Sequence, residues 1–84
     1  MEIKIHPKVK KYILESGQKD MLVTHLKHLA TDPYHSRSGV NIKKLKGRYH
    51  DMYRLKVGDH RFEYFIDEET VWVDHAFLRK KGYR

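Results

Sequence analysis

The sequence contains no cysteine, and this absence excludes several kinds of protein. Without cysteine there is no disulfide framework and no thiolate ligand for a metal, and nothing indicates an oxidising compartment. No stretch approaches the roughly 20 apolar residues that span a bilayer. The first residues, Met1 to Pro7, lack the apolar core of a secretory signal. We therefore expect a cytoplasmic protein with no membrane partner.

The chain is also too short for a second domain. Its 84 residues form a single domain, 1–84, and no repeat or low-complexity segment interrupts it. A domain of this size buries only about 60% of the surface that its unfolded chain exposes. We therefore expect a shallow working groove rather than a deep cavity.

Acidic residues are outnumbered. The chain has 18 lysines and arginines against 11 aspartates and glutamates, a formal net charge of +7. Such an excess on a small domain favours a nucleic acid, an acidic protein or an anionic membrane as partner. A basic surface that only keeps the protein in solution is the alternative.

The two prolines mark the boundaries of two predicted helices. Residues 1–5 alternate apolar and charged side chains, which is typical of a short strand. Pro7 fits the first turn of a helix, and Gly17 is a natural residue to end it. A second helix is predicted over about 18–31, because Pro33 disfavours helical geometry in the residue before it. Two short helices with a tight link indicate an αα-hairpin.

After residue 41 the apolar period changes to two. Ile42 and Leu45 lie between lysines, and strands are predicted over 51–57, 61–66 and 71–77. We predict an α+β domain. Its short N-terminal strand and αα-hairpin pack on one face of a three- to four-stranded, mainly antiparallel sheet.

The hairpin around Gly58 concentrates positive charge. Arg54 and Lys56 point to one face of their strand, and Arg61 can point to that face from the next strand. Three adjacent cations repel one another, and bound anions such as phosphates would relieve the repulsion. The alternative is an ordinary solvated face on which Glu63 partly neutralises Arg61.

The last strand and the C-terminal segment leave two questions open. Strict alternation places Val71 and Val73 on the same face as His75. The valines belong in the core, so His75 and Arg79 reach the basic hairpin only if the sheet twists or bulges there. Residues 78–84 hold four cations and Tyr83. They form either a frayed basic tail or a segment whose tyrosine folds back to stack on a base or to act in acid–base chemistry.

Seven histidines invite a nuclease interpretation, because imidazole suits acid–base work near neutral pH. His60 and His75 are the candidates, since His60 precedes Arg61 and His75 lies on the last strand. By simple alternation the His60 side chain points away from Arg61. Four further histidines lack the spacing of metal ligands and are expected to be surface residues: His25, His28, His35 and His50. We therefore predict no metal site.

An ordered set of short motifs resembles the RelE/ParE superfamily of type II toxins. Leu-Lys-Gly at 45–47 precedes a Tyr-Arg-Leu-x-x-Gly-x-x-Arg-x-x-Tyr pattern at 53–64. The helix stop at Asp32-Pro33 and the pair Arg79 and Tyr83 are similar to family features at corresponding places. The resemblance covers nearly the whole chain and implies a RelE-like fold.

The resemblance to RelE-like toxins also implies an activity: cleavage of mRNA on the ribosome, without metal or other cofactor, by attack of a ribose 2′-OH on its own 3′-phosphate. This reaction needs a base, cations around the phosphoryl oxygens and an acid for the leaving 5′-oxygen. Tyr83 or Lys56 would be the base, Arg61 and Arg79 would stabilise the transition state, and Arg54 would be the acid or an electrostatic helper.

The expected RNA contacts surround this set. They are Lys43, Lys44, Lys46, Arg48, His60, His75, Lys80 and Lys81. The family also implies an acidic antitoxin as the protein partner, which suits a basic domain. Two other functions stay open: a ParE-like inhibitor of DNA gyrase, and a catalytically silent binding module or corepressor.

Overall fold

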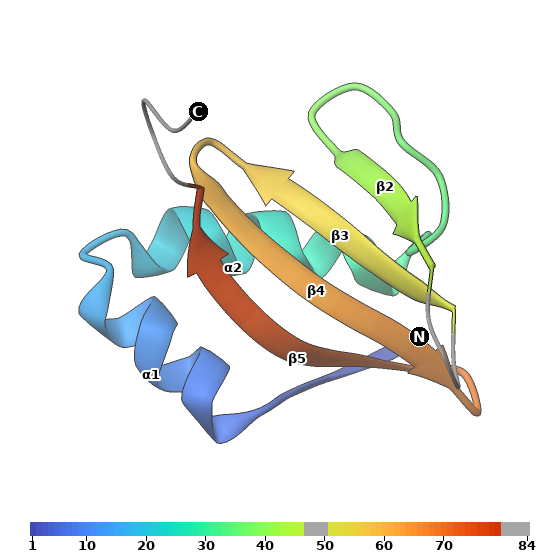
Figure 1. Ribbon diagram of the computed structural model, residues 1–84, viewed down its shortest axis with the longest axis horizontal. Helices are drawn as coiled ribbons and strands as arrows, with labels where there is room; N and C mark the ends of the chain where they lie inside the picture. Colours follow the sequence, from blue (N-terminus) through green and yellow to red (C-terminus); the bar gives the residue numbers. More distant parts are fainter. Residues whose placement is uncertain (47–50, 80–84) are drawn as a thin grey trace.

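Two helices cover one face of a five-stranded sheet in the computed structural model, which describes residues 1–46 and 51–79 (Figure 1). The helices are α1 (Pro7–Glu15) and α2 (Lys19–Lys27), and a turn of 3-10 helix follows at His28–Ala30. The strands are β1 (Glu2–Ile5), β2 (Asn41–Leu45), β3 (Met52–Val57), β4 (His60–Asp67) and β5 (Thr70–Leu78). In Figure 1 α2 passes behind β3 and β4.

The sheet has the order β1-β5-β4-β3-β2. β1 is parallel to β5, and the other neighbouring pairs are antiparallel. The predicted α+β class is confirmed. The N-terminal strand joins the same sheet as the other four, so the sheet has five strands. Within the described residues, no helix has the length and apolar character needed to cross a membrane.

The boundaries of α1 follow from its flanking residues. The His6 ring nitrogen Nδ1 accepts a hydrogen bond of 3.0 Å from the Lys8 amide, and Pro7 occupies the first helical position. At the other end, Gly17 has a φ of +74°, a conformation that costs glycine little. The predicted start and stop of this helix are therefore confirmed.

The core lies between the helices and the sheet. Its largest fully buried side chains include Tyr64 and Phe62 from β4 and Leu22 and Leu26 from α2. The hydroxyl of Tyr64 donates a hydrogen bond of 2.6 Å to the carbonyl of Pro33. Burial raises the pKa of Tyr64 above its usual range, so the phenol stays protonated and keeps donating at neutral pH.

A bulge in β5 changes which side chains face the core. Val73 is opposite Tyr64, but His75 is opposite the preceding residue, Glu63, so that Asp74 has no partner in the register. An extra residue in one strand inverts the orientation of the residues after it. Val71 and Val73 are therefore buried, while His75 points to the opposite face. The bulge resolves the conflict left open by strict alternation.

We expect Tyr64→Phe to destabilise the fold although it keeps the aromatic ring. The variant leaves the Pro33 carbonyl without its donor, which costs about 1 to 3 kcal/mol for a buried group. Thermal and denaturant unfolding would measure the loss. Tyr34→Phe is the matched control, because that side chain is exposed. Equal stability of the Tyr64→Phe variant and wild type would contradict the assignment.

Candidate functional site

The face of the sheet away from the helices is called the open face below. Two of its cross-strand rows of side chains hold predicted site residues. Each of these two rows runs across four strands, from β2 to β5. The first row is Lys43, Arg54, Glu63 and His75. The second row is Asn41, Lys56, Arg61 and Phe77. Neighbouring strands are about 4.8 Å apart, and the rows are about 7 Å apart along the strands. The prediction that Arg54, Lys56 and Arg61 share a face is confirmed.

Arg61 is held against the β3–β4 turn. Only 9% of the residue is exposed, and its Nη1 donates to the carbonyls of Gly58, at 2.7 Å, and His60, at 3.0 Å. A guanidinium has five N–H donors in a fixed fork. Its remaining N–H groups can therefore bind an anion while Nη1 fixes the turn.

Glu63 is the carboxylate of the two rows, and it pairs within the first row. Its Oε2 accepts a hydrogen bond of 3.0 Å from Arg54 Nη2, and its Oε1 lies 3.3 Å from His75 Nδ1. The Arg54 guanidinium also lies 5.7 Å from the centre of the Phe77 ring. The alternative considered above paired Glu63 with Arg61, but its partners in the structure are Arg54 and His75.

The carboxylate–imidazole pair was missed from the sequence. Glu63 and His75 are twelve residues apart, and only the bulge brings both to the open face. The feature that could have revealed it is the conflict between the buried valines and His75 on the same strand.

The exposed cations are the groups that a ligand can reach. Lys43 and Lys56 are exposed on the open face, and Lys56 has no ion pair within residues 1–46 and 51–79. Lys46 is exposed just after β2. The side chain of Arg79 is exposed, and its backbone amide donates to the carbonyl of Asp59 at 2.7 Å. The backbone of Arg79 therefore lies beside the turn that Arg61 stabilises.

Lys44 lies apart from these cations. It is opposite Tyr53 in the register, so it belongs to the other face of β2, and its Nζ lies 3.4 Å from Asp51 Oδ2. The structure does not bring Lys44 together with Arg54 and Lys56, because side chains alternate along the strand. Four predicted site residues lie outside the described part of the chain: Arg48, Lys80, Lys81 and Tyr83.

His60 is on the helix side of the sheet and is not part of the open face. The residue is 9% exposed, its Nδ1 lies 2.7 Å from the Tyr12 hydroxyl, and its Nε2 lies 2.7 Å from Gln18 Oε1. The structure places His60 apart from Arg54, Lys56 and Arg61, and its contact with RNA stays a prediction. Its neighbour Arg61 points the opposite way, so His60 joins the hairpin to the helices instead.

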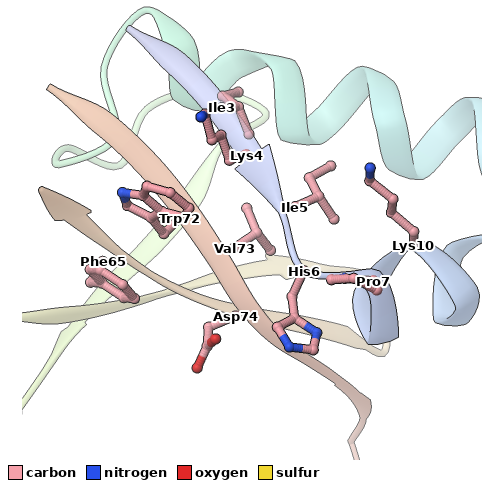
Figure 2. A pocket seen from close by; sticks show the side chains of 10 residues that line it. All are labelled: Ile3, Lys4, Ile5, His6, Pro7, Lys10, Phe65, Trp72, Val73 and Asp74. Carbon is pink, nitrogen blue, oxygen red and sulfur yellow. The ribbon is translucent and has the colours of Figure 1, made fainter.

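A groove of about 490 Å³ lies beside β1, β5 and the start of α1 (Figure 2), and its Phe65 and Trp72 belong to the open face. The Trp72 ring, 38% of which is exposed, stacks on Phe65 with centroids 6.4 Å apart. Lys4 Nζ lies 5.4 Å from the Trp72 ring centre, and Figure 2 shows Lys10 on the far side of the groove. This groove contains none of the predicted catalytic residues. The sequence offered one signal for it, a tryptophan alternating out of the core.

Comparison with known proteins gives a structural likeness. No model of a protein family matches the sequence, and no curated protein matches it significantly. The archaeal RelE-RelB complex from Pyrococcus horikoshii OT3 contains a chain similar to this one. Its TM-score is 0.79 and its identity 22%, over 96% of this chain and 97% of that chain.

A second similar structure is the RelB-RelE antitoxin-toxin complex from Methanococcus jannaschii. Its TM-score is 0.68 and its identity 15%, over 95% of this chain and 98% of the other. Likenesses at these identities establish the fold. This chain therefore has the RelE fold, as its motifs led us to expect.

The separate roles of His60 and Lys56 can be tested on a single-stranded RNA oligonucleotide. We expect Lys56→Ala to weaken binding and to reduce the slope of log affinity against log salt by about 0.7 for each phosphate that the variant no longer neutralises. We expect His60→Ala to leave the RNA affinity and the salt slope unchanged. It should lower the free energy of unfolding by about 1 to 3 kcal/mol, because Tyr12 and Gln18 lose their hydrogen-bond partner. A salt titration and thermal melts measure these effects. Weaker RNA binding by folded His60→Ala protein would contradict the placement.

Proposed function

We propose that this protein is the toxin of a type II toxin–antitoxin pair and that it cleaves mRNA on the ribosome without a metal ion. The observation that carries the proposal is the cluster of cations at the tip of the β3–β4 hairpin. Lys56 and Arg61 are opposite each other there, and the backbone of Arg79 lies beside the turn.

The cluster suits the chemistry of phosphodiester cleavage. As a 2′-oxygen attacks phosphorus, negative charge builds up on the phosphoryl oxygens, and fixed cations that face them lower the barrier. Arg61 is already fixed by the turn carbonyls. Exposed Lys56 and Arg79 can approach the same phosphate from either side. The RelE fold adds support, since one of the similar chains comes from a structure described as an antitoxin-toxin complex.

The same cluster of cations favours the proposed function over the two alternatives. A gyrase inhibitor that acts by binding has no evident need for cations gathered around one phosphate. A silent binding module needs positive charge, but not an arginine fixed by two carbonyls at the tip of a hairpin. Both alternatives predict intact mRNA, and this separates them from the proposed function.

We expect the purified protein to cut mRNA within codons in a translating extract, as mapped by primer extension. Arg79→Ala should lower the cleavage rate by about 10²- to 10³-fold, the usual effect of removing one transition-state donor. Arg61→Ala should do the same, with thermal melts to separate lost catalysis from loss of the turn.

The matched control is Lys27→Ala, which removes an exposed cation from α2. Intact mRNA together with inhibited supercoiling would replace the proposal with the gyrase-inhibitor function. Intact mRNA with normal supercoiling would favour the silent binding module.

The toxin function requires an antitoxin, and the Trp72 groove is suited to bind one. Its apolar lining offers a place for an apolar side chain, while Lys4 and Lys10 supply positive charge at its sides. An acidic, amphipathic segment complements both features. The Trp72 and Phe65 rings lie on the open face, in the row next to Glu63 and His75. We propose that the antitoxin covers Trp72 in addition to any contact it makes with the cations.

We expect Trp72→Ala to weaken binding of the protein encoded beside this gene by about 2 kcal/mol or more, or roughly 30-fold, as is usual for a central aromatic contact. Isothermal titration measures the change. Leu14→Ala is the control, because Leu14 is exposed on α1 outside this groove. Equal weakening by both variants, or by neither, would rule out this groove.

A further inference from the structure

We infer that His75 is the general base of the cleavage reaction and that Glu63 is the residue that positions it. The inference rests on the proposed function and deepens it, because it assigns removal of the 2′-OH proton to His75 in place of Tyr83 or Lys56. It begins from the contact of 3.3 Å between His75 Nδ1 and Glu63 Oε1 on the open face.

The pair leaves one ring nitrogen ready to accept a proton. A carboxylate can only accept a hydrogen bond, so its contact with Nδ1 favours the tautomer that carries hydrogen on Nδ1. The lone pair then lies on Nε2, the other ring nitrogen. The His75 side chain is 62% exposed, so that a substrate can reach it. The ring also lies 5.1 Å from that of Phe77, which limits its rotation.

Glu63 is itself held in place. Its second oxygen, Oε2, accepts from Arg54 at 3.0 Å, and its side chain is only 21% exposed. Arg54 in turn lies over the Phe77 ring. A catalytic side chain is positioned best by neighbours whose own conformations are fixed. Arg54 and Phe77 therefore support Glu63, and Glu63 orients His75.

The pair is correctly placed relative to the phosphate-binding cations. Lys56 and Arg61 belong to the second row, whereas Glu63 and His75 belong to the first, about 7 Å along the strands. A phosphate bound over the second row would place its own ribose over the first. The 2′-OH can then come within hydrogen-bond reach of His75 Nε2, as general base catalysis requires.

His75 Nε2 takes the proton of the 2′-OH, the 2′-oxygen forms a bond to phosphorus, and the bond from phosphorus to the 5′-oxygen breaks. The Lys56 ammonium gives a proton to the 5′-oxygen. The products are a 2′,3′-cyclic phosphate and a 5′-hydroxyl end. Solvent then returns the proton to Lys56 and removes the one held by His75.

The charges around His75 bear on the pH dependence. Glu63 is opposite on β4, with Arg61 two residues away on the same strand, and Arg54 reaches Glu63 from β3. Asp74 precedes His75 on β5. A general base acts in its unprotonated form, so we expect the cleavage rate to rise with pH.

The test is single-turnover cleavage of mRNA on programmed ribosomes, with the protein in excess, from pH 6 to pH 8. We expect His75→Gln to cleave about 10²-fold more slowly or worse and to lose the rise with pH. Co-sedimentation with ribosomes should stay unchanged. His28→Gln is the matched control, an exposed histidine on the helix side of the molecule. Thermal melts confirm that each variant is folded.

The positioning role of Glu63 is tested by a double-mutant cycle. Glu63→Gln can present an N–H to Nδ1 and so favour the wrong tautomer, which should slow cleavage without changing ribosome binding. In the His75→Gln background the same change should have no further effect. Effects that multiply in the double variant would overturn the positioning role.

The outcomes separate this inference from the proposed function. If wild type cleaves and His75→Gln cleaves as fast, or keeps the rise with pH, His75 is not the base while the proposed function stands. If wild type leaves mRNA intact on the ribosome, the proposed function fails, and the assignment of His75 fails with it.

Discussion

The bulge at Asp74 is the constraint on which the open face depends. Side chains alternate along a strand, so one unpaired residue inverts every position after it. Before the bulge, β5 supplies Val71 and Val73 to the core; after it, β5 supplies His75 and Phe77 to the open face. The same strand thus completes the core at one end and the candidate site at the other. A straight strand could not do both, because either an imidazole would enter the core or a valine would leave it.

The tip of the β3–β4 hairpin is held from both faces of the sheet. Arg61 binds the turn carbonyls on the open face, and His60, the preceding residue, bonds to Tyr12 and Gln18 on the helix face. Consecutive residues of a strand point in opposite directions, so each can have a different partner. The turn is therefore fixed before any ligand binds. An anion that binds Arg61 would therefore meet side chains whose positions are already fixed.

The cations of the open face have different roles in spite of their equal charge. Arg54 is engaged by Glu63 and Phe77, so it supports the carboxylate, whereas Lys43 and Lys56 stay exposed. The Glu63 carboxylate also reduces the electrostatic repulsion between the cations around it. Counting charges along the sequence could not reveal this division. It depends on which side chains are opposite each other across strands, and the register between strands decides that.

The sequence by itself determined the order of the helices and strands. It also determined that Arg54, Lys56 and Arg61 lie on the same face of the sheet. Pro7 and Gly17 delimit α1 through backbone geometry, and alternation is a property of each strand alone. Its motifs also predicted the RelE fold. Only the tertiary structure decided that His60 is buried, that Lys44 is on the other face, and that His75 meets Glu63. Those outcomes depend on the bulge in β5 and on contacts between residues that are distant in the sequence. A local alternation pattern does not reveal such contacts, because they are set by how the strands and helices pack together.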